Sequence, residues 1–260
     1  LNNNLTGKIE IILVSMIYNA VRKHKTNGFE GILGSEAGLR FKQAVTEDKE
    51  VENFLESNIS NIALDAEFAK RDNYTLKGQR EEDGVIKPAE IMISNRFTYI
   101  DDKGNKQFVN TDDIIYKDEK GQRFIDTNKL PKEALEIFGF RIPTQSLNST
   151  AFVKVVGILP DTYSEMILAN KDLIRQTGHD FDIDKFFLNT FNLEKKTSDE
   201  DSSFYNLIED EESIQGLENK ALGVRLAIHK NTSEEVQSLV KTPLDDNNFA
   251  EEAEWIDSAY

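Results

Sequence analysis

The sequence predicts an α+β fold in which a strand-rich core lies between helical flanks. Between residues 85 and 191, short apolar runs alternate with turn-rich stretches such as DDKGNK (101–106), which is typical of strands joined by hairpins. Outside this region, apolar residues recur at helical spacing. Many short strands with few inserted helices favour a closed or nearly closed barrel over a parallel sheet.

Residues 1–84 are predicted to be a helical region. The stretch KIEIILVSMIYNAVRKHK (8–25) is apolar, has basic residues in its last turn and is followed by glycines, as at the end of a helix. Residues 48–72 also place apolar side chains near helical spacing. We interpret both segments as scaffold helices.

The predicted core, residues 85–191, consists of strands and one short helix. The helix is expected over residues 130–140 (LPKEALEIFGF), because Pro131 stands at its start and Gly139 near its end. The predicted strands are 89–100, 107–110, 113–116, 123–126, 151–160, 164–169 and 185–191.

The remainder of the chain is predicted in two parts. Residues 192–215 are polar and acidic, which favours a mobile insertion. Residues 216–260 are expected to contain two helices, over 216–231 and 233–243, followed by an acidic tail.

Composition excludes several classes of function. With 31 Lys+Arg against 47 Asp+Glu, the formal net charge is −16, so a large basic face that holds nucleic acid unaided is not expected. The chain has no cysteine, which excludes disulfides, zinc–thiolate sites and cysteine nucleophiles. No apolar run is long enough to span a membrane, and no membrane partner is expected. The chain begins with Leu1 and nothing in it resembles a signal peptide, so we expect a piece of a longer protein.

The stretch TGHDFDIDKFF (177–187) carries the strongest chemical signal. In an extended conformation Asp180, Asp182 and Asp184 point to one side, and like charges so close together destabilise the fold unless a cation lies among them. An EF-hand loop starting at Asp180 is excluded, because Lys185 and Phe191 occupy the positions that need Gly and Glu. An edge strand with a polar face is an alternative. We favour a site for a hard cation, Mg²⁺ or Mn²⁺, bound by the three carboxylates.

A second motif lies upstream, in GFRIPTQSLNSTAFVKVVGILP (139–160). Together with GHDFDID it resembles the catalytic barrel of multisubunit-type RNA polymerases, whose largest subunit has Arg-x-Pro-Thr followed by Asp-Phe-Asp-Gly-Asp. The likeness is greater to the RNA polymerases of crAss-like bacteriophages, in which the loop reads Asp-Phe-Asp-Ile-Asp. The resemblance covers residues 135–187 well and 216–245 loosely. It implies a double-psi β-barrel over residues 85–191.

The resemblance also implies roles for individual residues. Asp180, Asp182 and Asp184 would hold the catalytic Mg²⁺ that binds the RNA 3′ end and the incoming ribonucleoside triphosphate. Arg141 would contact the sugar or phosphate of that nucleotide, or form an ion pair within the aspartate cluster, and the two roles are compatible. His179, which stands where we expect serine or alanine, would contact phosphate or cap the loop. Pro143 and Thr144 are interpreted as structural, and Ile183 replaces the glycine of cellular enzymes.

These polymerases need a second barrel, whose lysines contact the triphosphate. Only one aspartate triplet is present here, so we interpret the chain as the metal-bearing part of a larger DNA-dependent RNA polymerase. Its expected partners are a nucleic acid template, the RNA product, ribonucleoside triphosphates and a second barrel in the same parent chain or in a partner subunit. The expected location is the phage virion and then the cytoplasm of the host bacterium.

Two other functions remain open at this stage. The barrel could be a non-catalytic module of a virion or mobile-element protein, with a structural cation site. A metal-dependent nuclease or phosphohydrolase would use the same carboxylates, but it needs a general base for water, and His179 is the nearby candidate.

Overall fold

The fold is α+β, as predicted, and contains many strands and few helices. The computed structural model describes residues 28–33, 48–142, 149–163, 165–179, 185–197 and 203–230. The strands in these ranges are β1 (Gly28–Leu33), β2 (Ala63–Leu64), β3 (Arg80–Glu82), β4 (Val85–Lys87), β5 (Ala89–Ser94), β6 (Thr98–Ile100), β7 (Lys106–Phe108), β8 (Ile115–Lys117), β9 (Arg123–Ile125), β10 (Glu136–Phe140), β11 (Thr150–Leu159), β12 (Met166–Ala169), β13 (Lys185–Asn189), β14 (Leu193–Thr197) and β15 (Ser203–Leu207). The α-helices are α2 (Asp48–Asn58), α3 (Lys171–Gln176) and α4 (Ile214–His229), and the short 3₁₀ helices are η1 (Ile59–Asn61), η2 (Phe68–Lys70), η3 (Thr111–Asp113), η4 (Lys132–Leu135) and η6 (Asp161–Tyr163).

The main sheet contains six strands whose pairings return to their starting point. The sheet order is β10-β13-β1-β12-β5-β11-β2-β9-β8, and β10 pairs in addition with β11. Strand β10 thus has two antiparallel neighbours, β13 and β11. We call β1, β5, β10, β11, β12 and β13 the strand ring. Strands β2, β9 and β8 continue the sheet outward from β11.

The strand ring consists of two halves with equivalent pairing. Its parallel pairs are β1–β12 and β5–β11, and its other pairs are antiparallel. The first half consists of β1, β5 and β10, and the second of β11, β12 and β13. When β1 is exchanged with β11, β5 with β12 and β10 with β13, every parallel pair becomes a parallel pair and every antiparallel pair an antiparallel pair. The ring therefore has a pseudo-twofold relation between its halves.

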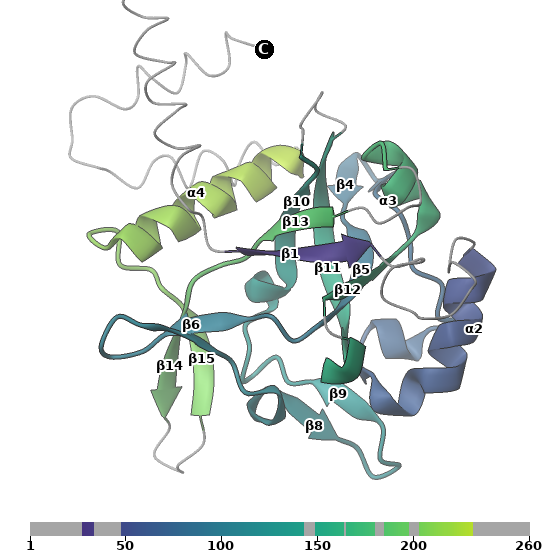
Figure 1. The fold of residues 1–260 in the computed structure, drawn as a ribbon, viewed down its shortest axis with the longest axis horizontal. Helices are drawn as coiled ribbons and strands as arrows, with labels where there is room; N and C mark the ends of the chain where they lie inside the picture. Colours follow the sequence, from purple (N-terminus) through teal and green to yellow (C-terminus); the bar gives the residue numbers. More distant parts are fainter. Residues whose placement is uncertain are drawn as a thin grey trace, which may run out of the picture.

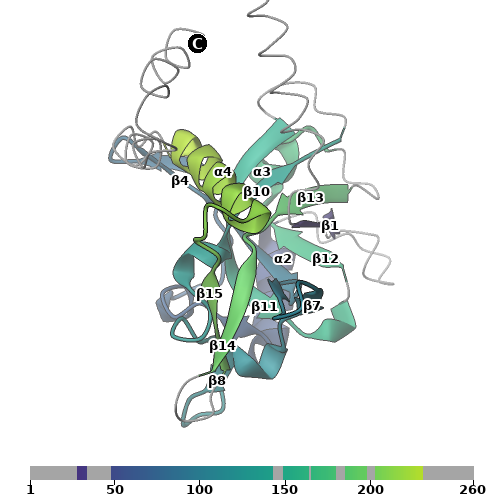
Figure 2. The same cartoon turned by 90° about the vertical axis from the view of Figure 1, so that its left-hand side faces the viewer.

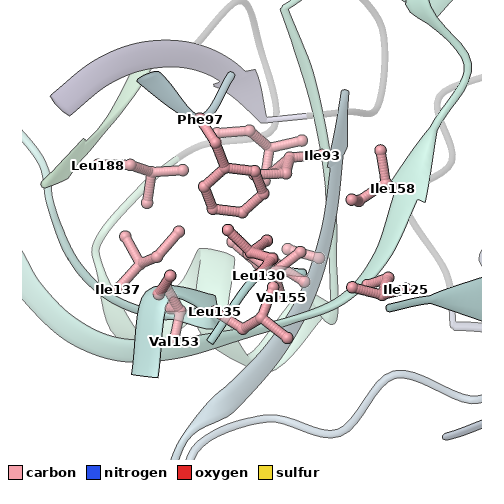
Figure 3. Close-up of a cluster of buried hydrophobic side chains, with 14 of the residues drawn as sticks. Ile93, Phe97, Ile125, Leu130, Leu135, Ile137, Val153, Val155, Ile158 and Leu188 are labelled. Atoms are coloured by element: carbon pink, nitrogen blue, oxygen red, sulfur yellow. The ribbon is translucent and has the colours of Figure 1, made fainter. Parts of the chain in front are cut away.

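The largest apolar cluster takes side chains from five strands of the strand ring, β5, β10, β11, β12 and β13. Successive side chains of a strand point to opposite faces, so Ile137 on β10 and Leu188 on β13 point into this core. Figure 3 shows these two side chains close to residues from β5, β11 and the connecting segments. The labelled members of the cluster are Ile93, Phe97, Ile125, Leu130, Leu135, Ile137, Val153, Val155, Ile158 and Leu188.

Helices cover the outside of the ring. Figure 1 shows α4 across one side and α2 at another, and Figure 2 shows α4 in front with α2 behind it. Leu222 and Leu226 of α4 pack on Phe152 of β11 and Phe191. Leu55 of α2 belongs to a second apolar cluster, on the side where β2 pairs with β11.

The first 84 residues are less helical than predicted, where the structure describes them. The helix predicted over 48–72 ends at Asn58, and the chain continues through η1 into β2, because the consecutive buried residues Ile62, Ala63 and Leu64 suit a strand. Strand β1 lies in the same region and pairs with β12 and β13, so it belongs to the strand ring. The predicted helix 8–25 lies outside the described residues.

Two further segments differ from the prediction. The helix predicted over 130–140 is a single 3₁₀ turn, η4, after which β10 begins. In the predicted insertion 192–215, β14 and β15 form an antiparallel pair, and β14 also pairs with β6. Strand β15 is held because Tyr205 is buried and its hydroxyl donates to Asp113 at 2.9 Å. The helix predicted over 216–231 is confirmed as α4, and the one over 233–243 lies outside the described residues.

Closure of the ring requires a glycine at position 139. This residue pairs with Ala151 on β11 and with Leu188 on β13, and a Cβ at this position would overlap the buried ring of Phe186. We therefore expect Gly139→Ala to lower the free energy of unfolding by about 1–3 kcal/mol, measured by urea denaturation. Adding Phe186→Leu should recover part of the loss. A single variant as stable as the parent chain would contradict this account of the closure.

Candidate active site

The three aspartates of the motif lie outside the described residues, but the residues on both sides of them are described. Residues 180–184 connect His179, just after α3, to Lys185, the first residue of β13. Strand β13 lies in the strand ring between β10 and β1. The two residues that flank the segment, His179 and Lys185, therefore have defined positions beside the ring.

The first end is a helix terminus that depends on Gly178. Helix α3 is capped at its start by Asn170, whose side chain accepts a hydrogen bond from the amide of Asp172 at 2.7 Å. At its other end Gly178 has φ +75°, a left-handed conformation that glycine adopts without steric cost, and the amide of His179 donates to Ile174 O at 3.0 Å. The glycine before the aspartates thus turns the chain out of the helix and toward β13.

His179 joins the two ends of the segment. Its side chain is buried, with 5% of its surface exposed, and its ring meets Phe186 edge-on. Nδ1 is hydrogen-bonded to the hydroxyl of Thr177, and Nε2 lies 3.3 Å from Lys185 O. A carbonyl oxygen only accepts, so Nε2 is the donor in the second contact. Of the two roles considered for His179, these contacts favour the one in which it holds the loop.

Arg141 lies at the same place because of the pairing of β10. Strand β10 runs antiparallel to β13, and Phe140 pairs with Phe187, so the end of β10 adjoins the start of β13. The amide of Arg141 donates to Ser149 O at 2.9 Å, and its Nη1 donates to Gly178 O. Arg141 contacts Gly178, and His179 contacts Lys185, so these two residues, which were predicted to bind substrate, both lie beside the described ends of residues 180–184, which we call the base of that segment. Pro143 and Thr144 lie outside the described residues.

An aromatic pair beside this base was not predicted. The rings of Phe140 and Phe187 stack on the outer face of β10 and β13 with centroids 5.6 Å apart, and Phe138 follows at 6.2 Å from Phe140. All three side chains are partly exposed. The alternation in FGF (138–140) indicates that Phe138 and Phe140 share a face, but their partner on β13 follows only from the strand register.

The described residues contain no other candidate for the metal. Within the ranges that the structure covers, no group of three or more His, Asp or Glu side chains is placed to hold an ion. A cavity of about 410 Å³ near Asp65 and Lys154 contains none of the predicted site residues. The three aspartates of the motif lie outside those ranges, so the cation site expected there stays a prediction.

Two comparisons with known proteins bear on the family of this chain. No protein-family model matches it, and no curated protein matches it at a significant level. In the part of the chain that the structure covers, no helix is long and apolar enough to cross a membrane.

The position of His179 generates a prediction about stability. We expect His179→Ala to lower the free energy of unfolding by about 2–4 kcal/mol, because it leaves a buried cavity and removes the contacts to Thr177 and Lys185. Urea denaturation measures the effect. The matched variant Thr177→Val removes only the hydroxyl and should cost about 1 kcal/mol. Equal losses in the two variants would mean that the ring itself contributes nothing.

Proposed function

We propose that this chain is the metal-bearing catalytic part of a phage-type DNA-dependent RNA polymerase. In this proposal Asp180, Asp182 and Asp184 hold Mg²⁺, for which Mn²⁺ can substitute, and the reaction is nucleotidyl transfer. The observation that carries the proposal is the meeting of Arg141 with the base of residues 180–184. Arg141 and Gly178 are 37 residues apart in the sequence, and the pairing of β10 with β13, which brings them into contact, supports the proposal.

The proposal includes a double-psi β-barrel, and the topology of the strand ring supports it. Six strands pair in a cycle, parallel and antiparallel pairs are mixed, and the two halves are equivalent. The parallel pair β1–β12 of the ring has its counterpart in the parallel pair β5–β11. Such a repeat of the pairing is not required of a mixed sheet in general. The proposed barrel differs in extent from the predicted range of 85–191, because β1 takes part in the ring.

The proposed site gives a different role to each of its predicted residues. When bound, the metal supplies electrostatic stabilisation of phosphate charge and orients the reacting groups. The guanidinium of Arg141 is planar and always charged, which suits a contact with a phosphate or a ribose. His179 is a positioning residue, since its ring nitrogens are used in contacts that hold the two ends of the loop together.

The proposed enzyme is incomplete without a second barrel. A chain with a net charge of −16 does not provide the positive channel that template and product require. We therefore propose that a lysine-bearing barrel, in the same parent chain or in a partner subunit, completes the site. The template would be DNA, the substrates ribonucleoside triphosphates, and the location the virion and then the host cytoplasm.

Binding of Mn²⁺ tests the metal site directly. We expect the chain to bind Mn²⁺, detected by the loss of the free-ion signal in electron paramagnetic resonance. Asp182→Asn should weaken the affinity by about tenfold or more, because one anionic ligand is lost. The matched control is Asp161→Asn, an exposed aspartate just after the end of β11. The start of β11, Thr150, pairs with Phe140 beside Arg141, so Asp161 lies at the far end of this strand from the candidate site. Equal affinity in both variants would contradict the assignment of the site.

A second step separates the polymerase from a structural cation site in a non-catalytic module. In the polymerase, the three aspartates would hold the metal and Arg141 would contact the triphosphate, so a ribonucleoside triphosphate should tighten Mn²⁺ binding to the parent chain more than to an Arg141→Met variant. A structural cation site predicts no such difference. In the parent polymerase, Asp182→Asn should abolish RNA synthesis while the protein remains folded.

A further inference from the structure

Helix α4 has a second apolar face, directed away from the sheet. Its inner face, with Leu222 and Leu226, packs on the outside of the strand ring. On the other side, apolar residues recur at intervals of three and four, which is the spacing of a helix seam. We call this set the outer stripe, and it consists of Ile214, Leu217, Ala221, Val224 and Ile228.

The outer stripe exposes large apolar side chains. Ile214 is 61% exposed, Leu217 41% and Ile228 52%, and Ala221 between them is also exposed. At 100° per residue the stripe is centred roughly opposite Leu222 and Leu226, so α4 itself cannot turn it toward the sheet. A row of this kind on a helix fits the apolar face of a second helix.

The chain contains a segment that matches the outer stripe in length and character. Residues 9–21 (IEIILVSMIYNAV) have one charged residue, Glu10, and are predicted to be helical. As a helix they would be about 18 Å long, against about 21 Å from Ile214 to Ile228. A segment with so little polar surface requires an apolar partner when it is exposed to water.

The strand register places the start of β1 beside α4. Gly28 pairs with Asn189 on β13, and Asn189 pairs with Phe138 on β10. Neighbouring strands are about 4.8 Å apart, so Gly28 lies about 10 Å from Phe138. The ring of Phe138 is 5.8 Å from the guanidinium of Arg225 on α4. The six residues 22–27 span up to about 20 Å, which is sufficient to bring residues 9–21 over α4.

The charges at the two ends favour one direction of packing. Four acidic residues, 209–212, precede α4, whereas RKHK (22–25) follows the apolar segment. Opposite charges attract across the interface when residue 25 lies near the start of α4. The apolar segment would then run antiparallel to α4, with Ile9 nearest Ile228.

We propose that residues 9–21 pack as an antiparallel helix on the outer stripe of α4 in the same molecule. The strand ring then has two helical layers on this side, α4 and the N-terminal segment. This inference is independent of the proposed polymerase function, because it uses none of the residues of the metal site.

Site-specific photo-crosslinking tests the proposal in the full chain. The chain has no cysteine, so Ala221→Cys provides a single attachment point for a benzophenone maleimide without removing a large side chain. After irradiation, peptide mass spectrometry of the monomer band should find crosslinks to residues 9–21. The matched control is Glu119→Cys, in the exposed turn between β8 and β9 at the opposite end of the molecule (Figure 1), which should give none to that segment.

The alternative outcomes overturn the proposal in distinguishable ways. Crosslinks in a dimer band would show that a second copy covers the outer stripe. Crosslinks to residues 233–243, or none at Ala221→Cys, would also exclude residues 9–21 as its partner.

A charge variant gives an independent measurement. Leu217→Asp with Ile228→Asp should release the segment and speed tryptic cleavage at Arg22 and Lys23 by about tenfold or more. Both side chains point away from the sheet, so near-ultraviolet circular dichroism should confirm an intact core. An unchanged cleavage rate with an intact core would also refute the proposal.

Discussion

The pairing of β10 with two antiparallel neighbours is the constraint on which the rest of the structure depends. Strands β11 and β13 are the first and last strands of the second half of the strand ring, and β10, the last strand of the first half, pairs with both. This arrangement requires Gly139 on the inner face, opposite Phe186, and leaves Phe138 and Phe140 on the outer face. Because β10 ends beside the start of β13, Arg141 also reaches the base of residues 180–184.

Much of the strand content could be predicted from local patterns, whereas the pairing could not. Runs such as AEIMIS and AFVKVVGIL are apolar and rich in β-branched residues, and they form β5 and β11 within the predicted ranges. Strand β1 was missed because GFEGIL contains two glycines and follows an apolar segment of helical character. Its place depends on contacts with β12 and β13, more than 130 residues away, which no local window contains.

In the candidate site, too, the motifs could be predicted from the sequence, whereas the contacts between distant residues could not. The aspartate motif and the upstream arginine motif are visible in the sequence, and the structure brings Arg141 and Gly178 into contact. The sequence left two roles for His179, contact with phosphate and capping of the loop, because a sequence does not show whether a histidine is buried. Its contacts with Thr177 and Lys185 depend in addition on the turn at Gly178. Strand β14 was predicted as insertion because its lysines are polar, but a strand at the surface can expose one face to water.

The equivalence of the two halves has a consequence for how the candidate site is divided. Under the exchange of halves, β13 corresponds to β10, so the aspartate segment before β13 corresponds to the segment containing η4 before β10. That counterpart reads PKEAL and has no aspartate, whereas Arg141 follows β10 and Thr190 follows β13. Of the two equivalent halves, one therefore carries the three aspartates in its sequence and the other is followed by Arg141. The proposed site would therefore need one half of each kind, because two copies of the same half would supply only the aspartates or only the arginine.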